Sequence, residues 1–211
     1  MKHGVTPVIY YCNPNIYPRE EYEIRKDECT RYAQALGLEI IDADYDHEVW
    51  LEAVKGLELE PERGGRCLKC FKLRLLRTAE YAAAHGIRVI TSTLASSRWK
   101  SLEQINEAGT WACEQIERRF SAVPVASARC TENIAAAMAP EQSDGEWSAC
   151  PSGTVDVSRQ GVDILPVKSP VYWTYNWKKG GLQERRLQII KEYDFYNQLY
   201  CGCEFSMRKD D

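Results

Sequence analysis

The chain has 211 residues, of which 44% are apolar and 27% charged, and its formal net charge is -4. This length allows one domain with a substantial core. No run approaches the roughly 18 uninterrupted apolar residues of a membrane span. The first residues lack the apolar stretch of a signal peptide. We therefore expect a cytoplasmic protein with no membrane contact. The negative net charge argues against a broadly basic surface that coats nucleic acid, so any RNA contact must be confined to a local patch.

The first part of the chain alternates strand and helix patterns. Residues 5–12 are β-branched and aromatic and end at a turn signal, which predicts a buried strand. Apolar residues recur at helical spacing over 19–36, which predicts a helix. A second strand is expected over 38–42, a short helix over 49–54, and a long helix over about 67–86.

The alternation continues toward the C-terminus. A third strand is expected over 87–93, a helix over about 99–119, a strand over 171–174 and a helix over about 182–193. The pattern predicts an α/β fold with a mostly parallel sheet and flanking helices, in which reactive groups gather in the loops after the strands. We expect residues 1–211 to form a single domain with a low-complexity insertion at about 121–169.

Nine cysteines are an odd number in a chain that is not a small secreted scaffold, so a disulfide framework is disfavoured. Cys67 and Cys70 form a C-x-x-C motif at the start of a predicted helix. The helix N-terminus stabilises thiolates and lowers their pKa, and thiolate is the form that binds metal. A single C-x-x-C does not distinguish metal binding from redox chemistry or chance.

A second pair of cysteines lies near the C-terminus. Cys201 and Cys203 are separated by Gly202, which permits a tight turn. A disulfide in so small a ring is strained and easily reduced, which suits an electron relay. The two pairs could also be the four ligands of a structural zinc ion, and on spacing alone this alternative ranks level with a redox site.

The other five cysteines lack paired spacing. Cys29 and Cys113 lie within predicted helices and are expected to be buried small residues. Cys130 and Cys150 fall in the insertion, and we expect no role for them. Cys12 ends the first predicted strand.

Two polar segments are candidates for RNA contact. Ser97, Arg98 and Lys100 follow a strand and open a predicted helix, a position suited to a phosphate or a ribose. Ordinary helix capping gives the same pattern. Trp177 and Lys178 belong to a stretch that interleaves aromatics with cations, as a base-stacking surface would. A strand end that packs against the protein would show the same pattern of aromatic and cationic residues.

Several motifs cover most of the chain outside 121–169. They are YYCNPNIYPREEYEIRKDE from Tyr10, DADYD from Asp42, AVKGLELEPERGGRCLKCFKLRLLRTAEYA from Ala53, TSTLASSRWKSLEQIN from Thr91, and VYWTYNWKKGG with YCGCEFS near the end. Together they closely resemble the QueH-type epoxyqueuosine reductases.

The resemblance implies an adenine-nucleotide α-hydrolase-like fold and a two-electron reaction. The epoxide oxygen is removed from epoxyqueuosine at the wobble position of tRNA, which gives queuosine. The resemblance also implies a 4Fe-4S cluster, allows an additional iron, and requires an electron donor that the sequence does not identify. By motif, Cys67 and Cys70 would be cluster ligands, and Cys201 and Cys203 the redox-active disulfide pair.

The resemblance also predicts a departure from the family at the N-terminus. Chains of the family begin with a further β-α unit, whose strand ends in adjacent cysteines. Those cysteines supply the other cluster ligands. This first β-α unit is expected to be absent here. An incomplete cluster and a poorly paired sheet would follow. The competing accounts are a start codon called too late, a truncated chain, and a divergent protein that has lost the activity; we favour the first. Cys12 is a candidate substitute ligand.

Two functions from other classes remain open. A non-catalytic, zinc-stapled RNA-binding module would use the same four cysteines to hold two segments together. A general thiol–disulfide oxidoreductase would use them without any metal.

Overall fold

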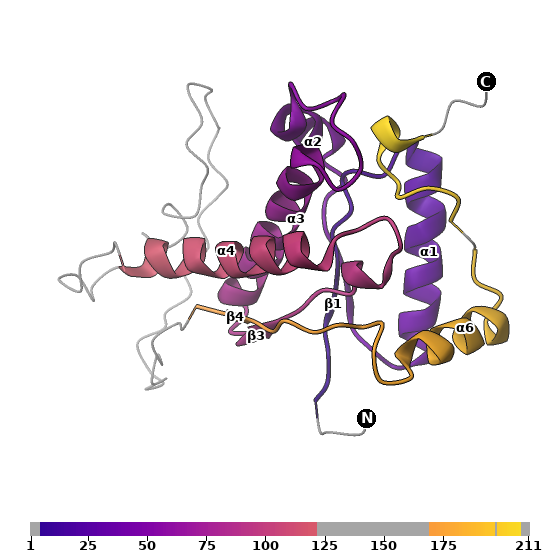
Figure 1. Ribbon diagram of the computed structural model, residues 1–211. Coiled ribbons are helices and arrows are strands. Elements are labelled where there is room, and N and C mark those ends of the chain that lie inside the picture. Colours follow the sequence, from indigo (N-terminus) through magenta and orange to yellow (C-terminus); the bar gives the residue numbers. More distant parts are fainter. Residues whose placement is uncertain (1–4, 122–168, 197, 208–211) are drawn as a thin grey trace, which may run out of the picture.

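The computed structural model describes residues 5–121, 169–196 and 198–207 (Figure 1). The elements before the gap are β1 (Ile9–Tyr11), α1 (Arg19–Ala35), β2 (Ile40–Asp42), α2 (His47–Val54), α3 (Gly65–Ala84), β3 (Val89–Ile90), the 3-10 turn η1 (Leu94–Ser96) and α4 (Leu102–Ser121). Those after it are β4 (Val171–Tyr172), α6 (Leu182–Glu192) and the 3-10 turn η2 (Glu204–Ser206). Most of the predicted insertion lies outside the described residues.

The strands form two parallel pairs. β1 pairs with β2, with Ile9 opposite Ile40, and β3 pairs with β4, with Val89 opposite Val171. The predicted α/β class and parallel pairing are confirmed. The single sheet is wrong for the described residues, because the two pairs share no hydrogen bonds. Each pair packs against a different hydrophobic cluster, and this separates them.

The main core lies between α3 and α4. Phe71 and Leu75 from α3 pack with Ile105 and Ile116 from α4, and all four side chains are buried. These residues recur at the three- and four-residue spacing of a helix face, which is why both helices were predictable. The core places the first turn of α3 beside the loop that leads into α4, and thereby positions two of the cysteines.

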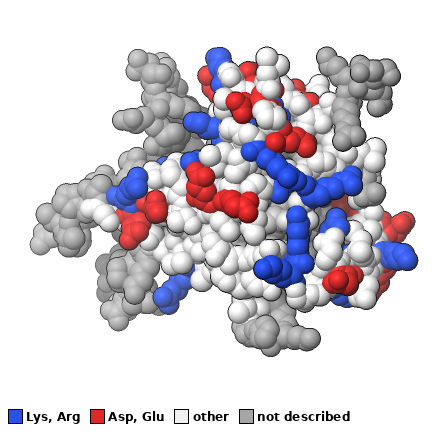
Figure 2. Space-filling view, in the orientation of Figure 1, with Lys and Arg blue, Asp and Glu red and all other residues white. Residues whose placement is uncertain are grey.

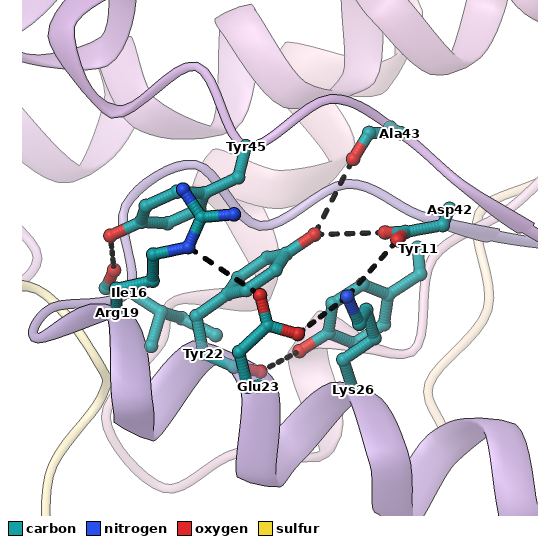
Figure 3. A network of polar contacts seen from close by, with 9 residues as sticks. All are labelled: Tyr11, Ile16, Arg19, Tyr22, Glu23, Lys26, Asp42, Ala43 and Tyr45. Carbon is teal, nitrogen blue, oxygen red and sulfur yellow. Dashed lines mark hydrogen bonds and ion pairs between the residues drawn. The ribbon is translucent and has the colours of Figure 1, made fainter.

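A smaller polar and aromatic network ties α1 to the β1–β2 pair (Figure 3). Tyr22 is buried, and its hydroxyl donates to Asp42 Oδ1 at 2.8 Å. Lys26 Nζ lies 3.2 Å from the second oxygen of the same carboxylate. The Tyr45 hydroxyl donates to the carbonyl of Ile16 at 2.6 Å. The acidic residue that ends β2 therefore anchors α1.

Several element boundaries differ from the predictions. The strands are two or three residues long, and α4 begins at Leu102 instead of residue 99. The reason is local at α4, where the Ser101 hydroxyl accepts a hydrogen bond from the Gln104 N–H and so caps the helix. Within the described residues, no helix is long and apolar enough to cross a membrane.

The C-terminal segment around Gly202 packs against α1 and the loop after β1. The Tyr17 N–H donates to the Gly202 carbonyl at 2.9 Å. Gly202 has φ of 105°, and a Cβ there would lie 2.9 Å from Arg25 Nη1 and 2.9 Å from Ile16 Cγ1. This turn needs glycine both for its backbone angle and for its close packing.

We predict that Gly202→Ala lowers the free energy of unfolding more than Gly86→Ala. Both glycines have positive φ, but a Cβ at Gly86 would have no atom within 4 Å. Gly86→Ala should therefore cost only backbone strain, about 1–2 kcal/mol. Gly202→Ala should cost about 1–3 kcal/mol more because of overpacking. Urea denaturation of the two variants makes the comparison, and equal losses would contradict the packing of this turn.

Candidate functional site

The two cysteine pairs come together at one cavity. Cys67 and Cys70 reach it from the first turns of α3, and Cys201 and Cys203 from the segment before η2. The other lining residues are Asn15, Trp50, Glu62, Arg66, Phe71, Arg74, Trp99 and Lys100. The cavity thus collects four thiols and three cations from segments far apart in the sequence.

The start of α3 presents both of its cysteines to the cavity because residues three apart share a helix face. Cys70 is buried beside Trp50 and Cys203, in a small cluster between α2, α3 and the C-terminal segment. Cys67 is half-buried, and the backbone N–H of Arg63 donates to its sulfur at 3.3 Å. A backbone donor of this kind suits a sulfur that carries negative charge.

The protonation of Cys67 differs from the prediction for a helix N-terminus. Burial raises the pKa of the Cys67 thiol, and the hydrogen bond from the Arg63 N–H only partly offsets this. The prediction of a lowered pKa at Cys67 is therefore wrong, because desolvation of the thiolate outweighs the favourable helix terminus.

Cys201 and Cys203 differ from each other. The pKa of Cys201 is lowered to about 5, first by a hydrogen bond from the Cys203 thiol and then by the Ser206 hydroxyl, against the opposing effect of burial. The same bond to Cys201, followed by burial, raises the pKa of Cys203. At neutral pH the pair therefore holds one thiolate and one thiol, with the charge on Cys201.

Three cations line the same cavity as the thiols. Burial, followed by repulsion from Arg74, lowers the pKa of Lys100 to about 8. Arg74 is buried and donates to the carbonyl of Cys12 at 2.9 Å. Arg66 is also buried and donates to the carbonyl of Glu58 at 2.6 Å. These cations favour negative charge within the cavity.

Three buried polar atoms on the cavity-lining residues have no hydrogen-bond partner. They are Asn15 Oδ1, Trp50 Nε1 and Arg66 Nε. Two of them are N–H donors, and donors of this kind hydrogen-bond the sulfurs of iron–sulfur clusters. The thiol pair of α3 and these free donors fit, in their chemistry, a thiolate-ligated iron–sulfur group.

The ligand set among the described residues is partial. No group of three or more His, Cys, Asp or Glu side chains in this part of the chain is arranged to hold a metal ion. This holds equally for the four thiolates of a zinc site and for those of an iron–sulfur cluster. Cys12 is buried, but it is not among the residues that line the cavity. Cys130 and Cys150 lie outside the described residues.

The structure brings the two predicted RNA-contact segments together. Lys178 Nζ donates to the carbonyl of Ser97 at 3.1 Å, and Arg63 donates through its guanidinium to the carbonyl of Arg98 at 2.5 Å. Figure 2 shows Lys and Arg side chains gathered on this face, over η1 and the loop that leads into α4. We name Arg63, Arg98 and Lys178 the basic rim.

The remaining predicted RNA-contact residues have different environments. Ser97, Arg98 and Lys100 lie in the loop before α4 and do not open the helix. Lys100 lines the thiol cavity. Trp177 is half-buried and packs edge-on against Tyr175, with ring centroids 4.7 Å apart. The neighbouring Trp173 is 48% exposed.

Several residues of the site were missed by sequence reasoning. Arg66 and Arg74 were not among the predicted site residues, yet both are buried and line the cavity. Ser206 contacts the Cys201 sulfur, with Oγ and Sγ 3.0 Å apart. His47 Nδ1 contacts the carbonyl of Pro14 at 2.7 Å, and Nε2 lies 3.3 Å from Glu204 Oε1, close enough for charge attraction but outside hydrogen-bond geometry. Of these residues, only Ser206 could have been identified from the sequence, because it follows the second cysteine pair closely.

Comparisons with known proteins show which family the chain resembles. The family model described as epoxyqueuosine reductase QueH matches residues 1–139 and 155–209. The chain is 38% identical over 205 residues to proteins of that name from Haemophilus influenzae and Histophilus somni, and 37% identical to one from Acinetobacter baylyi. Each alignment covers 97% of the chain.

The alignments cover less of the relatives than of this chain. They span 63% of the Haemophilus influenzae and Histophilus somni proteins and 71% of the Acinetobacter baylyi protein. The family match nevertheless includes both cysteine pairs and the loops of the basic rim. The chain therefore belongs to the epoxyqueuosine reductase QueH family.

Proposed function

We propose that the protein reduces epoxyqueuosine to queuosine in tRNA. The observation that carries the proposal is the meeting of a C-x-x-C pair and a C-x-C pair at one cavity. The names of the relatives, which are epoxyqueuosine reductases, supply the reaction. An enzyme with reduced thiols that acts on tRNA belongs in the cytoplasm.

The C-x-C pair has the capacity that this reaction needs. When Cys201 and Cys203 close to a disulfide, they release two electrons and two protons. Removing the epoxide oxygen consumes the same number, since both C–O bonds break, a C=C bond forms, and the oxygen leaves as water. A two-electron donor then returns the disulfide to two thiols; its identity lies outside this chain.

Cys67 and Cys70 are proposed as two ligands of a 4Fe-4S cluster. Their support is the pairing of sulfurs on one helix face and the free N–H donors of Trp50 and Arg66 nearby. Held there, such a cluster would supply one-electron transfer. The resemblance to the family also allows an additional iron, and we include it in the proposal.

The cations of the cavity stabilise the anionic species that the reaction creates. Lys100 and Arg66 neutralise a thiolate at Cys201 or an oxygen leaving the substrate, because attraction between charges is stronger away from bulk water. Phe71 and Trp50 are buried at the same cavity and limit the entry of water. These roles require no movement of the helices.

The fold of the proposed enzyme is of the adenine-nucleotide α-hydrolase type. Two parallel strand pairs and the crossover helix α1 between β1 and β2 support this arrangement. In such folds, substrates bind at the carboxyl ends of the strands. The loop after β3, which carries the basic rim residue Arg98, occupies that position.

Activity is the first test. With tRNA that contains epoxyqueuosine and a chemical reductant under anaerobic conditions, the protein should produce queuosine, detected by mass spectrometry of the nucleosides. Cys201→Ser and Cys203→Ser should each reduce the rate at least about 100-fold, because neither variant can form the disulfide. Cys113→Ala, a buried cysteine of α4 outside the cavity, is the control and should keep its activity. Full activity in the serine variants would refute the proposed role of the pair.

Iron content is the second test. Anaerobic reconstitution with iron and sulfide should give a broad absorbance near about 400 nm. Cys67→Ala and Cys70→Ala should each lower bound iron and this absorbance, while Cys113→Ala should not. If the protein binds only zinc, stays colourless and unfolds on chelation, the zinc-stapled RNA-binding alternative holds. Reduction of insulin without metal would favour a general thiol–disulfide oxidoreductase.

Binding of the anticodon stem-loop tests the basic rim. Arg98→Ala and Lys178→Ala should each weaken binding and lower the slope of log affinity against log salt by about one unit, the signature of one lost phosphate contact. Lys55→Ala is the matched control, since Lys55 is an exposed lysine at the end of α2 that pairs only with nearby Glu52. Fluorescence anisotropy at several salt concentrations provides the measurement. Equal slopes for all three variants would place the RNA elsewhere.

A further inference from the structure

The segment after the C-x-C pair turns back onto it. The Ser206 N–H donates to the carbonyl of Cys203 at 2.9 Å, and the Met207 N–H donates to the carbonyl of Glu204 at 3.1 Å. Phe205, between them, packs on the buried ring of Trp50 with centroids 5.9 Å apart. These contacts fix η2 and aim the Ser206 side chain at the pair.

The Ser206 hydroxyl meets the sulfur of Cys201 at an Oγ to Sγ distance of 3.0 Å. A serine hydroxyl is a flexible donor that can follow the charge on its partner. Hydrogen bonds to a charged group are also stronger than those between neutral groups. The contact therefore favours a Cys201 sulfur that is charged and held in one direction.

The two cysteines of the pair also differ in access. Cys203 is 6% exposed and belongs to the cluster with Trp50 and Cys70. Cys201 is half-buried and lies at the outer side of that cluster. The two cysteines of the C-x-C motif therefore have different surroundings, and we expect their thiols to differ in reactivity.

We propose that Ser206 is the positioning residue of the thiol pair: its hydroxyl holds Cys201 as the member that reacts with partners and leaves Cys203 as the member that closes the disulfide. This inference rests on the proposed function, because it assumes that the pair cycles between dithiol and disulfide. It adds an order of events and a residue that controls it.

The surrounding charges point in the same direction. Lys100 from the loop before α4 lines the same cavity as the thiol pair, together with Arg66 and Arg74 from α3. Ser206 also acts on Cys203, but there the bond to Cys201 and then burial outweigh its effect and raise the pKa. The hydroxyl thus strengthens an asymmetry that the fold already contains.

Alkylation of the reduced full-length chain tests the inference without tRNA or added metal. Iodoacetamide forms one S–C bond and releases iodide, and mass spectrometry of the peptides separates the labels on Cys201 and Cys203. At neutral pH the wild type should label Cys201 before Cys203, because Cys201 is the more exposed of the two.

Ser206→Ala should lower the ratio of Cys201 to Cys203 labelling about tenfold, because the Cys201 sulfur loses one hydrogen bond. Ser206→Thr, which keeps the hydroxyl, should restore the wild-type ratio, and circular dichroism establishes that both variants fold. The slower labelling of Cys201 in Ser206→Ala should persist in a Cys203→Ala background. An unchanged ratio in Ser206→Ala, or faster labelling of Cys203 than Cys201 in the wild type, would overturn the inference.

The outcome separates this inference from the proposed function. Loss of queuosine formation with the labelling order intact would count against the reductase and leave the role of Ser206 standing. Normal queuosine formation with equal labelling of both cysteines would count against the role of Ser206 and leave the reductase proposal standing.

Discussion

The buried ion pair between Arg25 and Glu21 holds the C-terminal segment of the chain on α1. Arg25 Nη2 lies 2.6 Å from Glu21 Oε1, and both side chains are nearly inaccessible to water. The guanidinium also donates to the carbonyl of Tyr200 at 3.3 Å, and the Tyr196 hydroxyl donates to Glu21 Oε2 at 3.0 Å. Because either charge left alone in this position would be strongly unfavourable, the pair fixes where Cys201 and Cys203 meet α3.

That placement gives chemically identical side chains different properties. Cys201 lies beside a thiol donor, a hydroxyl and a lysine, and its pKa falls to about 5. Cys67 lies at a helix N-terminus with a backbone donor, yet burial raises its pKa. The balance between desolvation and hydrogen bonding, more than the position of a cysteine on a helix, decides which sulfur carries charge.

The same loops that close the cavity carry the basic rim. Arg63 donates from its backbone to the Cys67 sulfur and from its side chain to the carbonyl of Arg98. Lys178 joins the rim through the carbonyl of Ser97. A ligand that neutralises these cations would therefore act on the loops that shape the cavity, without any separate relay element.

Local patterns in the sequence determined much of the fold. The helical spacing of apolar residues located α1 and α3 to within about two residues, and the C-x-x-C and C-x-C motifs identified the four cysteines that the cavity gathers. Strand lengths and the start of α4 were less predictable, because pairing partners and the Ser101 cap set them. The division into two strand pairs likewise reflects packing against separate clusters.

Only the tertiary structure decided how the cysteines differ. Arg25 and Ser206 lie within motifs of the chain, but the sequence does not show what they contact, since their partners lie in other segments or depend on a turn of the backbone. The burial of Arg66 and Arg74 could not be predicted from the sequence either, because a charged residue on a helix is expected to face water unless distant groups pair with it. The sequence thus identified the two cysteine pairs as the candidate site. Contacts between distant segments determined the charge, the exposure and the neighbours of their sulfurs.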